Sequence, residues 1–146
     1  MIDGATFMAF DQSENEFMVN VRALAQQRAW TEYHTHIAKR SADGFPDCVM
    51  ARSGHVLVAE LKREKPEPCS PSLAKKLDPT PAQVRWLDEL SAVAESIEAM
   101  RSVLPSSLRP SQPVMVVRLW RPSDWPEIER VLKGQGIEGG VGWRSR

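Results

Sequence analysis

Residues 44–62 read GFPDCVMARSGHVLVAELK, in which two short apolar runs flank a turn. Ser53 and Gly54 at the centre are typical of the two-residue loop of a β-hairpin. Counting back from that loop along both strands places Asp47 directly opposite Glu60, where Cβ atoms are about 4.5–5.5 Å apart. The sequence therefore predicts a hairpin that brings two carboxylates together at one end.

These carboxylates and the lysine that follows them suit a metal-dependent phosphodiesterase. Side chains alternate between the two faces of a strand, so Lys62 lies on the same face as Glu60. Two carboxylates this close repel each other unless a cation such as a hard divalent ion lies between them. We expect Asp47 and Glu60 to be its anionic ligands and the carbonyl of Leu61 to be a further ligand. Lys62 is expected to position a water molecule, to stabilise a phosphate, or both.

The alternative is a surface hairpin on which Glu60 and Lys62 are merely solvated. The run from Val56 to Ala59 is apolar on both faces, which is typical of a buried strand. A carboxylate at the end of a buried strand rarely lacks a function. This argument favours the metal site.

Hydrophobic periodicity and turn residues predict the remaining elements. We expect a first helix over 13–28, strands over 30–37, 45–50 and 56–62, a long proline-rich loop over 63–79, a second helix capped by Thr80, a strand over 114–120 and a short helix capped by Ser123 that ends near Leu132. The strand over 114–120 is expected to be central, and the glycine-rich tail from Lys133 to be poorly ordered. This pattern alone predicts an α/β or α+β sheet flanked by helices.

The motifs resemble the PD-(D/E)xK nuclease superfamily, with Pro46-Asp47 as its "PD" and Glu60-Leu61-Lys62 as its "(D/E)xK". The wider series looks like the VRR-NUC (virus-type replication-repair nuclease) branch in its small stand-alone phage form. It comprises SENEF at 13–17, YHT at 33–35, GFPD at 44–47, ELK at 60–62, TPAQVRWL at 80–87 and LWRPSDW at 119–125. The resemblance covers residues 13–132, leaves 1–12 and 133–146 as flexible termini, and implies a restriction-endonuclease-like core with a mixed sheet flanked by helices.

The resemblance implies an endonuclease that depends on Mg²⁺ or Mn²⁺ and is selective for branched DNA such as a four-way junction. In that family a glutamate on the first helix completes the metal site, which implies Glu16, with Glu14 as the second candidate. Glu16 can also simply close a capping box with Ser13. Gln83 of the Gln-x-x-Trp pattern is expected to face the active site, although it can equally be a helix-surface residue.

Several basic side chains are expected to bind the DNA backbone, which supplies affinity without sequence preference. They are His34, Lys39, Arg40, Arg63, Lys65, Lys75 and Lys76. Most charged loop residues are only solvated, so each of them alone is a weak candidate. His34 and His36 share a strand face, but no third nitrogen or sulfur ligand for zinc is evident.

The composition limits the classes of function. With 19 basic and 19 acidic residues the net charge is zero, which argues against coating nucleic acid by bulk electrostatics. No apolar run approaches the roughly 20 residues of a membrane span. The N-terminus does not read as a signal peptide, and two cysteines do not indicate a disulfide framework. We therefore expect a cytoplasmic protein without a membrane partner.

Paired cuts in a junction require two active sites, so we expect a homodimer, with Trp120, Trp125 and the apolar stripe of the second helix supplying spare apolar surface. Two other functions stay open: a nicking or homing nuclease, and a non-catalytic DNA-binding module with the same fold. A binding module has no need for the acidic pair of Asp47 and Glu60. No other nucleophile–base motif favours an unrelated hydrolase.

Overall fold

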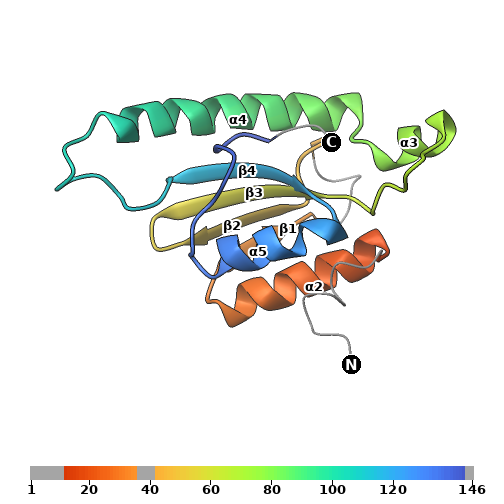
Figure 1. Ribbon diagram of the computed structural model, residues 1–146, viewed down its shortest axis with the longest axis horizontal. Coiled ribbons are helices and arrows are strands. Elements are labelled where there is room, and N and C mark those ends of the chain that lie inside the picture. Colours follow the sequence, from red (N-terminus) through yellow and green to blue (C-terminus); the bar gives the residue numbers. More distant parts are fainter. Residues whose placement is uncertain (1–11, 36–41, 144–146) are drawn as a thin grey trace.

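The computed structural model describes residues 12–35 and 42–143, which form one four-stranded sheet flanked by helices (Figure 1). In chain order the elements are α2 (Glu14–Gln27), β1 (Thr31–His34), β2 (Cys48–Arg52), β3 (His55–Leu61), α3 (Pro71–Leu77), α4 (Pro81–Ser102), β4 (Met115–Trp120), the 3₁₀ turn η2 (Pro122–Asp124) and α5 (Trp125–Leu132). The strand order is β1-β2-β3-β4. Only the β3–β4 pair is parallel. The expected α+β class with a mixed sheet flanked by helices is confirmed.

The hairpin of β2 and β3 has the predicted register. Arg52 pairs with His55, and the last pair of the ladder is Cys48 with Ala59. Ser53 and Gly54 have φ angles of 49° and 83°. Two successive positive φ angles are the signature of the type I′ turn, whose twist matches that of the strands. Asp47 and Glu60 follow the last pair by one residue on each strand, at the end of the sheet.

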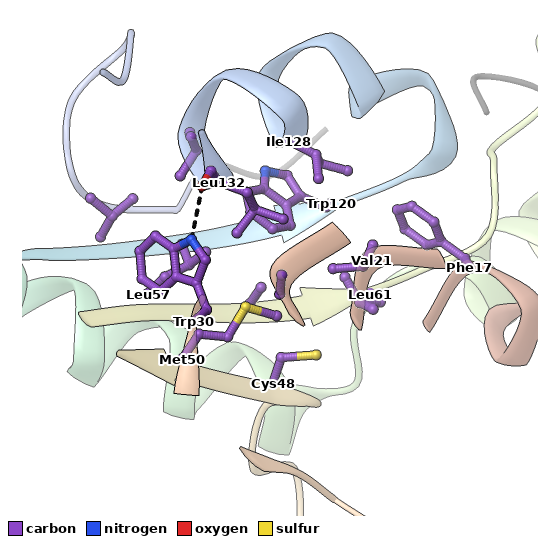
Figure 2. Close-up of a cluster of buried hydrophobic side chains, with 14 of the residues drawn as sticks. Phe17, Val21, Trp30, Cys48, Met50, Leu57, Leu61, Trp120, Ile128 and Leu132 are labelled. Atoms are coloured by element: carbon purple, nitrogen blue, oxygen red, sulfur yellow. Dashed lines mark hydrogen bonds between the residues drawn. The ribbon is translucent and has the colours of Figure 1, made fainter. Parts of the chain in front are cut away.

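Two helical layers cover the sheet. Helices α2 and α5 lie on one face and α4 on the other (Figure 1). The core beneath α2 and α5, drawn in Figure 2, includes Phe17, Val21, Trp30, Met50, Leu57, Trp120 and Leu132. The indole nitrogen of Trp30 donates to the carbonyl of Leu132 over 2.9 Å, so the one polar atom of this ring is satisfied inside the core. Within the described residues, no helix has both the length and the apolar character needed to cross a membrane.

Strand β4 is not central, contrary to expectation: it ends the strand order. Its outer edge is instead covered by the tail, because the amide of Val117 donates to the carbonyl of Val141 over 2.8 Å. The buried guanidinium of Arg118 donates to the carbonyls of Glu138, Gly140 and Gly142. The tail up to residue 143 therefore packs against the fold, and the expectation of a poorly ordered segment from Lys133 does not fit it.

Other expectations also need correction. Helix α3 occupies part of the stretch that we expected to be a loop, with Ser70 as its N-cap and Pro71 in its first turn. Ser123 was expected to cap the last helix, but the N-cap of α5 is Asp124. The amide and hydroxyl of Ser123 instead donate hydrogen bonds to the carboxylate of Glu64. The strand expected to reach residue 37 ends at His34, and residues 36–41 lie outside the described part of the chain.

The tryptophans expected to supply spare apolar surface are buried inside the chain: Trp120 is 0% and Trp125 is 4% exposed. They offer no support for a dimer interface. The second helix, which was also expected to supply apolar surface, has Val93 and Met100 exposed on α4, and Val103, Leu104 and Leu108 are exposed just after it. The homodimer stays a prediction.

Gly44 holds the chain that leads to Asp47 against the start of α4. Its φ angle is +78°, and a Cβ atom there would lie 2.4 Å from the carbonyl carbon of Ala82. Gly44→Ala should therefore lower the free energy of unfolding by at least about 2 kcal/mol, from left-handed strain plus overlap. Gly54→Ala is the matched control, because its φ is +83° and no atom lies within 4 Å of the added Cβ. Urea denaturation of both variants separates strain from overlap; equal losses would contradict the close contact.

Candidate metal centre

The end of β3 carries the predicted site residues. Glu60 is 2% and Lys62 is 7% exposed. The Nζ atom of Lys62 lies 3.7 Å from Oε1 of Glu60, so the two side chains share one face as predicted. The amide of Leu61 donates to Oδ2 of Asp47 over 2.8 Å, which fixes that carboxylate beside the end of β3. The structure thus brings Asp47, Glu60 and Lys62 together, and the solvated surface hairpin is not what forms.

Gln83 joins this group from the first turn of α4. Its Oε1 atom accepts from the amide of Thr80 over 2.8 Å, as part of a capping box. Its Nε2 atom donates to Oε1 of Glu60 over 2.7 Å. The cap therefore fixes the amide so that its NH₂ group points at Glu60, which agrees with the expected orientation toward the site.

Trp86 fixes the segment that precedes Asp47. Its indole nitrogen donates to the carbonyl of Asp43 over 3.1 Å, and its ring meets that of Phe45 edge to face at 5.1 Å. Thr35, which the sequence did not single out as a site residue, adds a second restraint. Its amide donates to the carbonyl of Asp47 over 3.0 Å and its hydroxyl to that of Pro46 over 3.3 Å. Thr35 belongs to the YHT motif at 33–35, but no local pattern shows that it contacts residues 46 and 47, which precede the neighbouring strand.

Burial dominates the electrostatics of the carboxyl pair. It raises the pKa of Glu60 to about 8, with the neighbouring charge of Asp47 as the second cause. Burial also raises the pKa of Asp47, although the hydrogen bond from the amide of Leu61 opposes that shift. Without a cation the pair therefore retains a proton near neutral pH, as expected for two carboxyl groups in one desolvated site.

This proton makes stability depend on pH. The ordinary pKa of a glutamate is 4.5, and that of Glu60 is about 8 in the folded chain. The stabilisation that this proton gives is fully present at pH values below the pKa of Glu60 in the unfolded chain. It is lost as pH rises through the pKa of Glu60 in the folded chain. Without metal, the free energy of unfolding should fall between these limits by up to about 1.4 kcal/mol per pH unit.

Thermal denaturation in EDTA across this range measures the slope. Glu60→Gln cannot ionise and should remove most of it, whereas exposed Glu89, replaced in the same way, should not. An unchanged slope in Glu60→Gln would contradict the assignment of the proton.

The arrangement fits a divalent ion. Oε2 of Glu60 is buried and has no hydrogen-bond partner within the described chain. An unpaired buried carboxylate oxygen costs about 1–3 kcal/mol or more, so a cation there removes a penalty. The amide of Leu61 points toward Asp47, and the carbonyl of the same strand residue points to the same side. Mg²⁺ commonly uses one or two carboxylates and keeps several water ligands.

A third carboxylate is not brought to this pair. Among residues 12–35 and 42–143, no group of three or more His, Cys, Asp or Glu side chains is placed to hold a metal. An open groove of ≈ 410 Å³ lies between α2 and the strand ends, lined by residues that include Glu14, Arg22, His34, Asp47 and Leu61. Glu14 borders this groove and Glu16 does not, while the amide of Glu16 donates to Oγ of Ser13 over 3.1 Å. Ser13 thus caps α2 through the amide of Glu16, and no contact among the described residues places the Glu16 side chain beside Asp47 and Glu60.

The expected DNA-binding residues differ in their surroundings. His34 lines the groove together with Asp47. Lys65 forms an ion pair of 2.9 Å with Asp78, which indicates a structural role. Arg63, Lys75 and Lys76 are exposed on the segment after β3, and Lys39 and Arg40 lie outside the described residues.

Comparison of the chain with protein-family models, with curated proteins and with solved structures gives no match. The case for a function therefore depends on the residues at the end of β3 and on the motifs that they form.

Proposed function

We propose that the chain is a DNA endonuclease dependent on Mg²⁺ or Mn²⁺, with the restriction-endonuclease-like core that its VRR-NUC resemblance implies. The observation that carries this proposal is Glu60, a buried carboxylate with one unpaired oxygen, next to Asp47 and Lys62. Burying such a group destabilises a fold unless a cation or a proton neutralises it. Buried ionisable groups that destabilise a fold in this way are commonly found at functional sites.

Each residue has a distinct task in phosphodiester hydrolysis. Asp47 and Glu60 would hold the ion, together with the carbonyl of Leu61; when bound, the ion acidifies water and neutralises charge on phosphate oxygens. The ammonium of Lys62 positions the attacking water or stabilises the phosphate. Gln83 and the amide of Leu61 keep the two carboxylates in place through their hydrogen bonds. This preorganisation matters because small displacements of reacting groups cost large factors in rate.

The second candidate, a non-catalytic DNA-binding module, has less support. Phosphate binding is served by an exposed basic surface. The end of β3 instead presents a buried pair of carboxyl groups, and the neighbouring Lys62 is itself only 7% exposed. The buried pair of Asp47 and Glu60 therefore favours catalysis over binding alone.

We also propose selectivity for branched DNA and a homodimer that would place two active sites on one junction. The support for both is the family resemblance alone. A nicking or homing nuclease is the alternative within the class. Light scattering at micromolar concentration, combined with mapping of the cuts in a four-way junction, distinguishes them. A monomer that makes only single nicks would favour the alternative.

The test of the function is incubation with labelled linear, flapped and four-way DNA in Mg²⁺, Mn²⁺ or EDTA. We expect cleavage with either ion, no cleavage in EDTA, and preference for branched substrates. Cleavage that persists in EDTA, or tight DNA binding without cleavage under any of these conditions, would contradict a metal-dependent nuclease.

A further inference from the structure

The segment over residues 63–79, which we call the arm, is inserted between two site residues. Lys62 directly precedes it, and Gln83 follows four residues after its end. The arm carries helix α3, which Figure 1 shows beyond the end of the sheet, beside the start of α4 and at the end where β3 stops. The arm therefore begins directly after the site and lies at the same end of the sheet.

One buried side chain ties both ends of the arm together. Nη1 of Arg121, a residue only 3% exposed, donates to the carbonyl of Arg63 over 2.6 Å and to that of Leu77 over 3.1 Å. A second tie is the 2.9 Å ion pair between Lys65 and Asp78. These contacts close the base of the arm, so its outer part has a fixed place relative to Lys62.

The charges of the arm are sorted along its length. At the base, Glu64 accepts two hydrogen bonds from Ser123, and Asp78 is neutralised by Lys65. In the last turn of α3, Lys75 and Lys76 are exposed and form no ion pair with any other described residue. Among the three lysines of the arm, the two on α3 are therefore the ones without an ion-pair partner in the described part of the chain.

We infer that the arm is a second DNA contact, in which Lys75 and Lys76 bind phosphates of DNA held at the active site. This inference rests on the proposed nuclease function. The chain has no net charge, and the two carboxylates would largely neutralise a divalent ion held between them, so further cations are needed to bind the DNA backbone. The lysines on α3 meet that need, because they are unpaired, are held by a closed base, and lie on a segment continuous with Lys62.

The test is the double variant Lys75→Ala/Lys76→Ala in the full chain. Binding is measured with fluorescently labelled four-way and linear DNA, in an Asp47→Asn background that prevents cutting, between about 50 and 200 mM salt. We expect Kd to rise about tenfold, and the slope of log affinity against log salt to decrease by about 1 to 2, since each lost phosphate contact removes about one unit.

The control is Arg28→Ala/Lys133→Ala, which removes the same formal charge at the hairpin-turn end of the sheet, together with the 3.2 Å ion pair between Lys133 and Glu129. There, Arg52 contacts the carbonyls of Arg28 and Leu132. Equal losses of affinity in both double variants would overturn the arm contact in favour of a general effect of net charge. An unchanged Kd and salt slope in the arm variant, with the parent still cutting DNA, would overturn the arm contact alone. A parent that neither binds nor cuts DNA would overturn the contact and the nuclease together.

Discussion

Replacing Asp47 by Asn, or Glu60 by Gln, is expected to lower metal-dependent DNA cleavage by about 1,000-fold or more, because each change removes an anionic ligand of the catalytic ion. Both replacements are nearly isosteric. An asparagine oxygen can still accept the hydrogen bond from the amide of Leu61, and a glutamine oxygen can still accept from Gln83. The loss should therefore appear in turnover and not in folding.

Calorimetry with Mg²⁺ or Mn²⁺ should show binding in the parent and its loss in both variants. Glu89→Gln removes the same charge from an exposed position on α4 and should leave cleavage and metal binding intact. Thermal denaturation separates a catalytic loss from a folding loss. In EDTA above neutral pH, Glu60→Gln should be at least as stable as the parent, because the buried carboxyl no longer has to ionise. Normal cleavage by either variant would show that the ion, if present, is held elsewhere.

The pairing of residues at the centre of the site could be predicted from sequence, because the two-residue turn fixes the register of the whole hairpin. Once Ser53 and Gly54 form a two-residue loop, every pair up to Cys48 with Ala59 follows, and the two carboxylates must meet beyond it. The orientation of Gln83 had a local signal as well. It stands three residues after Thr80, the spacing of a capping box, and the cap fixes the amide that contacts Glu60.

Features set by distant contacts could not be predicted in this way. Strand β4 reads as central because both its faces are apolar, but an edge strand covered by helices and a tail has the same pattern. The glycine-rich tail was expected to be poorly ordered, yet Arg118 of β4 donates hydrogen bonds to three of its carbonyls. The prolines of the arm led to the prediction of a loop where α3 forms, although Ser70 followed by Pro71 is a common helix start. For Glu16, the family resemblance implied the position, but nothing local to the sequence shows whether that side chain reaches Asp47 and Glu60.

Replacing Lys62 by Met should lower kcat by about 100-fold at saturating DNA and metal, while changing the Kd for DNA only a few-fold. The ammonium lies 3.7 Å from Glu60 in a site where Lys62 is only 7% exposed, so its charge acts in a desolvated environment. An interaction made mainly in the transition state reduces kcat and kcat/KM together, whereas a phosphate anchor changes KM. Because the positive charge of Lys62 also favours ionised Glu60, the variant must be measured over a range of metal concentrations.

Lys65→Met is the matched control, because it removes a lysine three residues along the chain that is paired with Asp78 at the base of the arm. It should keep the parent kcat. Lys62→Arg separates charge from placement: a guanidinium supplies the charge but spreads it over a planar group that does not fit the position of a compact ammonium. We expect it to recover only part of the lost rate. If Lys62→Met instead cuts at the parent rate once DNA is saturating, Lys62 acts as an anchor, and the water must be positioned by the metal and its carboxylates alone.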